Sequence, residues 1–518
     1  MRSTFHGIET AKRSLFTQQA ALQTTGHNIA NASTAGYSRQ VVNMTASRPI
    51  EAVGMMHSSI PGQLGTGVEF TSITRVREKF LDDQFRNENK NLGSWEVQSD
   101  TLEKIEAIVS EPSDSGIRTV MDSFWKSWSE LSKNPEDVTG RKIVRENAIA
   151  LADAFNLTSK QLKDLSNDLT ENINVKVNEI NSISTTIANL NSEIQRIEGL
   201  GDNANDLRDQ RDLLTDQLSK IANIQVQDTP QGYTIALGGS PLVDGGATTP
   251  TTTDILTAAF NSGALNSGQV HGMMLSRDRY VADYQRQLDT MANTLVNGEF
   301  TITIPKDSVL PEGTIINNVV YTGENRKLAS DLTVKINGIN GLHQLGYTLG
   351  SPPTKGGAFF TTKDNSGTVT AENIQLSAAI IASGDNIATS LRTVGTGADE
   401  SVVKGNNGLA LLMSQLKDVK FTINSSTGVT TGTVDDYYRS IVGQLGVQGM
   451  EASRNLTNQQ SLVDQVSSRR ESVSGVSLDE EMANMIKFQH AYNAAARAMT
   501  TFDETLDKVI NGMGVVGR

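Results

Sequence analysis

The most suggestive catalytic spacing in the chain is Ser123–Lys126, in which a serine precedes a lysine by three residues. In one class of acyl-transfer enzymes this spacing places a lysine beside a serine nucleophile. Here the pair lies in a run of large apolar residues at helical spacing, and the further motifs of that class are absent. Those apolar residues are Phe124, Trp125, Trp128 and Leu131. We therefore interpret the segment as the buried face of a helix.

Other residue types that catalyse reactions or bind metals form no pattern in this sequence. The chain has no cysteine, which excludes disulfides, thiolate nucleophiles and cysteine zinc sites. Its six histidines are scattered, and no two lie three or four residues apart, as a helical zinc motif would need. No phosphate-binding loop or hydrolase motif is present. The sequence predicts no catalytic residue, no metal site and no cofactor.

Composition narrows the classes of partner. With 518 residues the chain is too long for one core and should divide into two to four domains. Its formal net charge of -13 argues against nucleic acid and anionic membrane as partners, because both attract basic surfaces. No apolar run is long enough to span a bilayer, and no apolar segment of a cleaved signal peptide follows the first residues.

The two ends of the chain carry seven-residue patterns. Near the start, apolar residues recur every seventh position from Ile8 to Ile29. Near the end, a mostly apolar series that includes Gln489 and Asp503 steps by four and three from Leu478 to Met513. These spacings predict two amphipathic helices with coiled-coil seams. The predicted assembly residues on them are Ile8, Leu15, Leu22, Ile29, Leu478, Met482, Met485, Tyr492, Met499, Leu506, Ile510 and Met513.

The function of these end helices has two interpretations. They could form an ordinary helix pair that caps their own domain, or they could dock on further copies. An end helix that buries only one stripe gains less free energy than its ordering costs. We therefore expect both ends to be mobile in an isolated subunit and to order on assembly.

Between the ends, the pattern is helical at first. Helix is predicted from about residue 75 to 222, with a break at Gly199–Gly201 and a helix start at Asn134–Pro135. The charge-dense stretch Asp206–Asp212 is interpreted as a solvated helix face, with contact between subunits as the alternative. Residues 38–75 look irregular or extended, since they are rich in glycine and proline.

Alternating patterns then take over. Residues 224–237 predict a β-hairpin, and residues 272–297 predict a helix. From Phe300 to about Gly428 the chain is rich in Thr, Ser, Asn and Gly with short alternating runs, which predicts a β-rich insert with an inner helix at 409–416. Helix resumes near Asp435, with a break at Ser474–Gly475.

The predicted fold is therefore mainly α with a β-rich inserted domain, in a nested order in which both termini meet. Residues 1–45 and 476–518 would form the terminal helical coiled-coil domain. Residues 46–298 and 430–475 would form a body of long helices with a small β-hairpin, and residues 299–429 the outer insert.

Several stretches resemble one known family. Residues 28–40, which end in Tyr37-Ser38-Arg39-Gln40, resemble the N-terminal signature of bacterial flagellar axial proteins, and that ending is most similar to the hook-associated protein 1 family. Residues 134–156, 205–214 and 475–492 resemble the body and C-terminal signature of the same family. Ala35 stands where many relatives have proline, and nothing similar is seen for residues 300–371. The signature adds Asn28, Asn31, Thr34, Gly36 and Tyr37 to the predicted assembly residues.

The resemblance implies a structural role rather than catalysis. Members of this family leave the cytoplasm unfolded through the flagellar export channel, without a cleaved signal peptide, and an export chaperone binds their C-terminal region. Outside the cell they form a short helical ring, in which the terminal helices build an inner tube. Their neighbours are further copies, the hook protein and the second hook–filament junction protein. The ring adapts the hook to the filament.

Three alternatives stay open at this point. The chain could be another axial protein, such as a hook, rod or second junction subunit. It could be a secreted coiled-coil adhesin, although an adhesin does not need patterns at both ends. It could also carry an enzyme domain in the insert, where we find no carboxylate pair in a cleft-like motif.

Overall fold

The computed structural model describes residues 5–49, 63–109, 116–350, 353–395, 397–425 and 428–512. It divides into two compact units, each assembled from separate parts of the chain. Unit 1 comprises Met1–Trp95, Asn174–Gly272 and Leu456–Arg518, and unit 2 comprises Glu96–Ile173 and Met273–Asn455. In the described ranges, no helix is both long and apolar enough to cross a bilayer.

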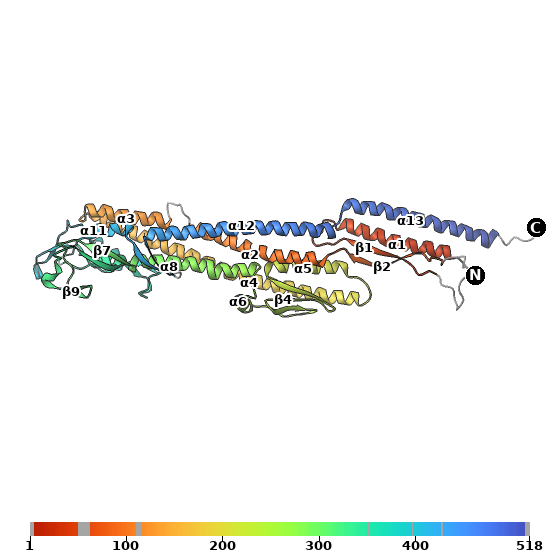
Figure 1. The fold of residues 1–518 in the computed structure, drawn as a ribbon, viewed down its shortest axis with the longest axis horizontal. Coiled ribbons are helices and arrows are strands. Elements are labelled where there is room, and N and C mark those ends of the chain that lie inside the picture. The colour runs from red at the N-terminus through yellow and green to blue at the C-terminus, as the bar shows by residue number, and fades with distance from the viewer. Residues whose placement is uncertain are drawn as a thin grey trace, which may run out of the picture. The chain divides into compact units, whose positions relative to one another are not determined.

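Helices dominate unit 1 (Figure 1). Four lie wholly within it: α1 (His6–Ala30), α5 (Asn205–Ile221), α6 (Thr253–Asn261) and α13 (Leu478–Asp507), which a short π-helical turn η6 (Lys508–Gly512) continues. Four more contribute residues to both units: α2 (Lys79–Val109), α4 (Val138–Glu198), α7 (Gln269–Leu275) and α12 (Val434–Ser474).

Two small antiparallel sheets complete unit 1. Strands β1 (Gln40–Ala46) and β2 (Val68–Arg75) pair with each other and lie against α1. A four-stranded meander joins β3 (Ile224–Thr229), β4 (Gly232–Leu237), β5 (Ser240–Asp244) and β6 (Ala247–Thr248) in that order. The core of the unit is aliphatic: Leu81, Leu92, Ile180, Ile187, Ile194, Leu218, Ile221, Ile235, Leu237, Leu242 and Leu256 are all buried.

The strands of unit 2 form one larger sheet and three short ribbons. The sheet order is β10 (Leu332–Asn337), β7 (Glu299–Ile304), β15 (Phe421–Ser425) and β16 (Gly428–Gly432), all antiparallel. The ribbons pair β8 (Thr314–Ile316) with β9 (Val319–Tyr321), β11 (Phe360–Thr362) with β12 (Ile374–Leu376), and β13 (Thr393–Val394) with β14 (Ser401–Val402).

Five helices of the described residues lie wholly within unit 2: α3 (Ile117–Lys133), α8 (Ala282–Asn297), α9 (Gly338–His343), α10 (Ala378–Ala382) and α11 (Gly408–Gln415). Of these, α8 contacts β15 and α9 contacts β10. A π-helical segment η1 (Ser276–Val281) leads into α8, and short 3-10 turns occur at η2 (Gly323–Arg326), η3 (Gly384–Asn386), η4 (Gly397–Asp399) and η5 (Leu416–Asp418).

An aromatic core in unit 2 tests the prediction that the segment around Ser123–Lys126 is the buried face of a helix. Phe124, Trp125 and Trp128 are buried, and Phe124 lies 6.0 Å from the ring of Phe359. Ser123 and Lys126 point to the exposed side of α3, where the serine hydroxyl donates to the carbonyl of Thr119. The prediction of a buried helix face is confirmed, because the aromatic stripe packs inward and the Ser/Lys pair does not line a cavity.

Most predicted elements have their counterparts. The break at Gly199–Gly201 separates α4 from α5, the hairpin at 224–237 is β3–β4, the inner helix is α11, and the break at 474–475 separates α12 from α13. Residues 38–75 contain the extended pair β1–β2. The insert does hold strands, but they are short and are interleaved with helices.

The helix start predicted at Asn134–Pro135 is wrong by three residues. Helix α4 begins at Val138, and the carboxylate of Asp137 accepts hydrogen bonds from the backbone N–H groups of Thr139 and Gly140, both at 3.0 Å. An aspartate side chain satisfies the free donors of the first turn better than proline does. The cap at Asp137 therefore decides the boundary.

Candidate assembly interface

Helices α1 and α13 lie side by side and run in opposite directions (Figure 1). The C-terminal end of α1 meets the N-terminal end of α13, where Asn28 and Glu481 are hydrogen-bonded. Near the other ends, Gly7 lies against the ring of Phe502. The fully buried residues of α13 are only Glu481, Ala495 and Leu506, so most of this helix faces away from its own subunit.

The predicted seam residues are exposed to different extents. On α1, Ile8, Leu15, Leu22 and Ile29 are half-buried. On α13, Leu478 is 50% exposed and Met482 is 51% exposed, and Ile510 in η6 reaches 65%. Met485, Tyr492 and Met499 are half-buried, Leu506 is buried, and Met513 lies outside the described residues.

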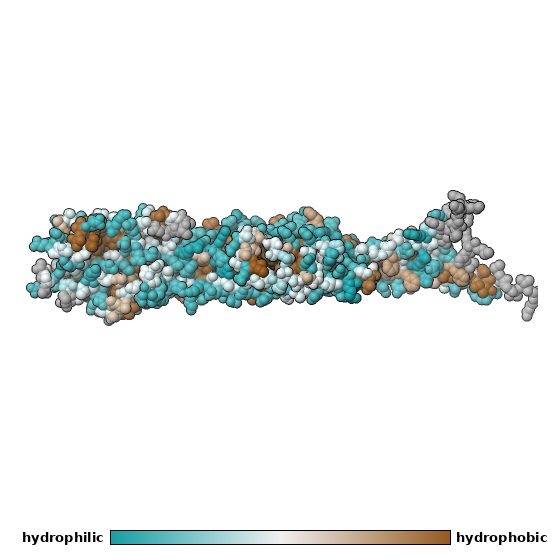
Figure 2. Space-filling view, turned by 90° about the horizontal axis from the view of Figure 1, so that it is seen from below, coloured by the Kyte–Doolittle hydropathy of each residue, from teal (hydrophilic) through white to brown (hydrophobic). Residues whose placement is uncertain are grey.

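Apolar side chains remain visible on this part of the surface. Figure 2 shows brown, apolar groups among polar ones over the region that α1, α13 and the β1–β2 pair form. On α13 the exposed apolar residues Leu478, Met482 and Ile486 follow one another at intervals of four, so they lie along one face of the helix. These three apolar side chains therefore remain in contact with solvent on one side of α13.

The signature residues after α1 build a polar cluster, which we name the junction cluster: Asn28, Tyr37, Arg39, Gln40 and Glu481. Asn28 is 1% exposed, and its amide donates to the carbonyl of Gln40 at 2.9 Å and to Glu481 at 3.0 Å. Its carbonyl oxygen accepts from the Tyr37 hydroxyl at 2.7 Å and from the Gln40 N–H at 3.0 Å. All the polar capacity of Asn28 is used within the subunit.

The turn between Asn28 and Tyr37 has a local cause. The Thr34 hydroxyl donates to the side chain of Asn31, and Gly36 adopts a φ of +79°, which favours glycine. Gly36 also approaches Leu213, with only 3.0 Å between an added Cβ and that side chain. Asn31, Thr34 and Gly36 therefore shape the turn that aims Tyr37 at Asn28.

Arg39 completes the link to α13. Its guanidinium donates to Glu481 at 2.9 Å and to Glu480 at 3.0 Å, and its backbone N–H donates to the carbonyl of Ser474 at 2.8 Å. Glu481 is 2% exposed, so its charge is fully compensated by Arg39 and Asn28. A buried carboxylate is tolerated only with such partners.

A second polar group, the α5 ion network, lies next to the junction cluster in unit 1. It consists of Asp209, Asp212 and Asp216 on α5 with Arg75, Arg77, Arg86 and Arg470. Arg75 bridges Asp209 at 2.6 Å and Asp212 at 2.9 Å, and Arg86 reaches Asp216 at 2.8 Å.

This network connects segments that are distant in sequence. The N–H and hydroxyl of Ser38 both donate to Asp209 at 2.8 Å, which joins the signature segment to α5. Arg470, near the end of α12, donates to Asp216 at 2.5 Å. The α5 ion network therefore fixes the segments that lead into α1 and α13.

The interpretation of Asp206–Asp212 as a solvated face is wrong. Asp209 and Asp212 are buried, because Arg75, Arg77 and Arg86 come from elsewhere in the chain to meet them. Arg211 is buried too, and it donates to the side chain of Asn191 at 3.0 Å. One signal could have pointed to this. Asp209, Asp212 and Asp216 are spaced by three and four residues, which places three carboxylates on one helix face without lysine or arginine between them on that face.

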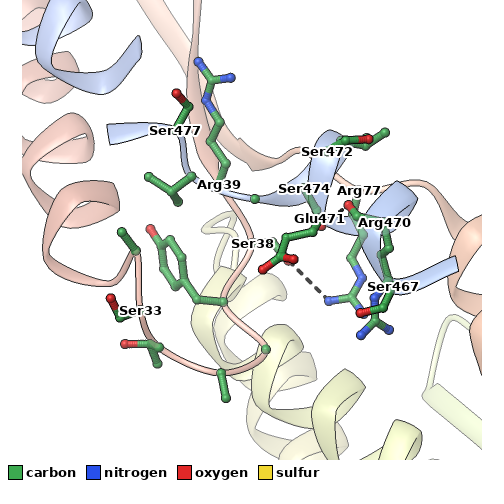
Figure 3. Close-up of a pocket in the computed structure, with 18 of the residues that line it drawn as sticks. Ser33, Ser38, Arg39, Arg77, Ser467, Arg470, Glu471, Ser472, Ser474 and Ser477 are labelled. Carbon is green, nitrogen blue, oxygen red and sulfur yellow. Dashed lines mark hydrogen bonds between the residues drawn. The ribbon is translucent and has the colours of Figure 1, made fainter. Parts of the chain in front are cut away.

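A polar cleft of about 550 Å³ opens beside both groups (Figure 3). The turn after α1 lines one side, and the linker between α12 and α13 lines the other. Arg39, Arg77 and Arg470 reach this cleft together with Glu471 and several serines. In the described ranges, no three His, Asp or Glu side chains are grouped so that they could hold a metal ion.

Three family models of flagellar proteins match three segments of the chain. A family model described as flagella basal body rod protein matches residues 8–37, one described as flagellar hook-associated protein FlgK helical domain matches residues 102–299, and one described as flagellar basal body rod FlgEFG protein C-terminal matches residues 467–512. The flagellar hook-associated protein 1 of Bacillus subtilis (strain 168) is 34% identical over 100% of both chains. The chain belongs to the flagellar hook-associated protein 1 family.

Two further matches are less similar in sequence to this chain than the Bacillus subtilis protein. The protein of Escherichia coli (strain K12) is 27% identical, over 97% of this chain and 99% of its own length. The structure described as that of the flagellar hook junction protein FlgK from Burkholderia pseudomallei matches with a TM-score of 0.51 at 15% identity, covering 76% of this chain and 100% of that one. This match shows a shared fold.

Membership of the hook-associated protein 1 family confirms the resemblance seen in the sequence. The chain is a structural component of the bacterial flagellum, and its relatives indicate no catalytic activity. The junction cluster joins residues from the first matched segment to residues from the third.

The electrostatics of Asp212 lead to a prediction about pH. Burial opposes its ionisation, but Arg77, Arg75 and Arg86 outweigh burial and lower its pKa from 3.8 to about 2. A carboxyl whose folded pKa is depressed stabilises the fold above its unfolded pKa, and this stabilisation is lost as pH falls through the folded pKa. Asp212 should therefore contribute about 2 kcal/mol at pH 5 that is lost towards pH 2.

The measurement is urea unfolding at several pH values between 5 and 2. In Asp212→Asn the free energy of unfolding should fall by about 2 kcal/mol less over this range than in the unsubstituted chain. Asp202→Asn, at an exposed position before α5, is the matched control and should leave the pH dependence unchanged. Equal pH dependence in Asp212→Asn and the unsubstituted chain would contradict the prediction.

Proposed function

We propose that this chain is a hook–filament junction subunit that polymerises through its terminal helices and adapts the hook to the filament. The observation that carries the proposal is the exposed apolar face of α13, where Leu478, Met482 and Ile486 are at least half exposed. Phe5 and Phe16, near the start of the chain, are also exposed, at 60% and 57%. Water contact on so much apolar surface is unfavourable, and burial between subunits removes it.

The partners follow from this role. They are further copies in a helical ring, the hook protein, the second hook–filament junction protein, and an export chaperone at the C-terminal region. The names of the relatives, hook-associated protein 1 and flagellar hook junction protein, support the place of the chain in the flagellum. Export through the flagellar channel without a cleaved signal peptide, to an extracellular location, belongs to the same proposal.

The terminal helices are proposed to order on assembly. Helix α13 is packed along one side only, since its buried residues are Glu481, Ala495 and Leu506, and α1 packs on α13 and on the β1–β2 pair. The free energy that one contact stripe supplies is small against the conformational entropy of ordering a whole helix. The coiled-coil seam and the three-part domain division with boundaries near 45, 298, 430 and 476 are part of this proposal.

Deletion of residues 478–518 tests the proposed function. In a strain that lacks the native chain, the truncated protein should allow hooks to form but no filament to grow, as seen by electron microscopy. A finer test replaces two residues of the exposed apolar face, Met482→Asp with Ile486→Asp. Because a charge in an apolar interface carries a large desolvation cost, these cells should not swim.

The matched control introduces aspartates on another side of the same helix, about 100° around from the apolar face. Ala483→Asp with Lys487→Asp changes two exposed residues at the same spacing, and these cells should swim. Normal swimming of the Met482→Asp, Ile486→Asp strain, with the variant present at normal level, would sink the proposed function.

A further inference from the structure

We propose that α1 and α13 pair in one fixed register, set by a buried polar contact at one end and a glycine–phenylalanine contact at the other. The polar contact joins Asn28 to Glu481 at 3.0 Å. The second places the ring of Phe502 directly over Gly7, so that an added Cβ would lie 2.6 Å from the ring. In both contacts the two residue numbers add to 509, as they must in an antiparallel pair without slippage.

The burial of intervening residues follows the same register. In this register, the positions of α1 that step by four and three from Gly7 to Asn28 face α13. The position of α13 that faces each of them is 509 minus the residue number on α1. On α1 these positions are 7, 11, 14, 18, 21, 25 and 28, and on α13 they are 502, 498, 495, 491, 488, 484 and 481. Ala11, Ala21 and Thr25 are 6%, 1% and 3% exposed, and Ala495 is 8% exposed. This contact line lies one position before the seam predicted from Ile8.

Small side chains along this line leave the register undetermined. Ala11, Ser14 and Ala21 on α1 face Ala498, Ala495 and Phe488 in the proposed pairing. Similar small residues would still meet if one helix slid by seven residues, because a heptad slip returns every position to the same face. Thr17 and Thr24, on the neighbouring face, satisfy their hydroxyls on their own helix and add no contact that selects a register.

The junction cluster penalises slippage in both directions. If α13 slides one way by seven residues, Glu481 meets Ala21 and loses both Asn28 and Arg39. If it slides the other way, Asn28 meets Phe488, and Glu481 passes the end of α1. Glu481 is 2% exposed, so a slip leaves either a buried carboxylate or a buried amide without partners. An unpaired buried charge disfavours a conformation by roughly a hundredfold or more.

The contact of Gly7 with Phe502 adds a weaker, steric preference. A slip that brings Phe502 to Ser14 puts a side chain where the ring now sits. Phe502 is 42% exposed, so its ring can turn towards solvent to relieve the clash. Most of the selectivity therefore rests on Asn28, Arg39 and Glu481, which act as positioning residues.

A fixed register gives every copy the same exposed face. A slip by one heptad would move Leu478, Met482 and Ile486 by about 10 Å along the pair. A repeating assembly of such pairs would then have mismatched contacts between copies. This consequence rests on the proposed function, whereas the register itself is a property of the chain.

Engineered disulfides can report the register, because the chain has no cysteine of its own. Two in-register double variants, Ser14→Cys with Ala495→Cys and Ala11→Cys with Ala498→Cys, have residue numbers that add to 509. Two heptad-shifted variants, Ala21→Cys with Ala495→Cys and Ala11→Cys with Ala491→Cys, add to 516 and 502. All four pairs replace small residues, so they perturb packing to a similar extent.

The pairs are oxidised in the purified full-length chain, in which the helices meet transiently, and in flagella isolated from cells, in which the pair is held. The ratio of rates reports the preferred register in both states. The in-register pairs should form intramolecular disulfides roughly a hundredfold faster than the shifted pairs. Adding Glu481→Ala and Phe502→Ala should reduce this ratio to below about tenfold, whereas Asp479→Ala, on an exposed residue of the same turn, should leave it unchanged.

Equal rates for in-register and shifted pairs would overturn the inference, as would disulfides that join two chains instead of closing within one. Failure of the proposed function looks different, because the chain would then be absent from the isolated flagella while the purified chain still showed the fast in-register disulfides.

Discussion

Asp212→Asn should lower the free energy of unfolding of unit 1 by about 2–3 kcal/mol at neutral pH, because Arg75, Arg77 and Arg86 each lose one of the carboxylates that compensate their buried charge. The Asp212 carboxylate is 1% exposed and lies 2.9 Å from Arg75 and 3.4 Å from Arg86. It also accepts a hydrogen bond from the Tyr233 hydroxyl at 2.5 Å. The neutral amide keeps the volume but loses the charge.

Unit 1 needs its own reporter in this experiment, since a chain with two units need not unfold in one step. Trp95 is half-buried at the edge of unit 1, and Trp125→Phe with Trp128→Phe makes it the only tryptophan, so that its fluorescence during urea unfolding follows this unit. Trp95→Phe makes the signal specific for unit 2 in the same way. Asp202→Asn serves as the control, because an exposed residue should change stability by less than about 0.5 kcal/mol. A loss below about 1 kcal/mol in Asp212→Asn would show that the arginines find other partners.

The second large effect is expected at Arg141 in unit 2. Its side chain is completely buried and, among the described residues, has no carboxylate within ion-pair distance; it donates instead to oxygens of neighbouring segments. Nε and Nη2 donate to the Pro135 carbonyl at 2.9 and 2.7 Å. Nη1 donates to the Ile387 carbonyl at 2.6 Å, and Nη2 also donates to the Thr389 hydroxyl at 2.6 Å. Burial lowers the pKa of Arg141 to about 10, against the smaller opposing effect of Asp385, so the group stays charged at neutral pH.

Arg141→Met should destabilise unit 2 by about 3–5 kcal/mol, because each buried carbonyl left without a donor costs roughly 1–3 kcal/mol. Arg141→Lys should recover part of the loss, since an ammonium can donate to some of these oxygens but cannot span all of them. Fluorescence of Trp125 and Trp128 follows unit 2 during urea unfolding, because both lie in the core of α3.

The neighbouring Lys142 is exposed, and Lys142→Met is therefore the matched control for loss of a cation from α4. It should shift the unfolding free energy by less than about 0.5 kcal/mol. If Arg141→Met unfolded at the same urea concentration as Lys142→Met, the hydrogen bonds of Arg141 would have to be replaced by others of equal strength.

Local features of the sequence were sufficient to predict most helices and strands. The seven-residue spacing predicted α1 and α13, Gly199–Gly201 and Gly475 predicted helix ends, and alternation predicted the hairpin at 224–237. These features depend on residues within a few positions of one another, so the sequence contains them directly. The same holds for the aromatic stripe of α3, whose spacing excluded a catalytic Ser123 before any contact was known.

The N-terminal signature indicated the protein family as well as a secondary-structure element. Asn28, Gly36 and Tyr37 pointed to a flagellar family, which the relatives confirm. Their physical task, however, became visible only in the fold. Asn28 and Tyr37 are used within the subunit, where they hold the turn after α1 against Glu481.

The sequence by itself determined the helical ends, the main breaks between elements, the absence of cysteine chemistry and the family. Only the tertiary structure decided the partners of the charges: Arg75 meets Asp209 across 134 residues, and Arg470 meets Asp216 across 254. It also decided the pairing of α1 with α13 at Asn28 and Glu481, which are 453 residues apart. A periodic pattern predicts that one face of a helix is buried, but it is compatible with many ion-pair partners and many helix registers. The choice among them depends on desolvation and hydrogen bonding between segments that only the folded chain brings together.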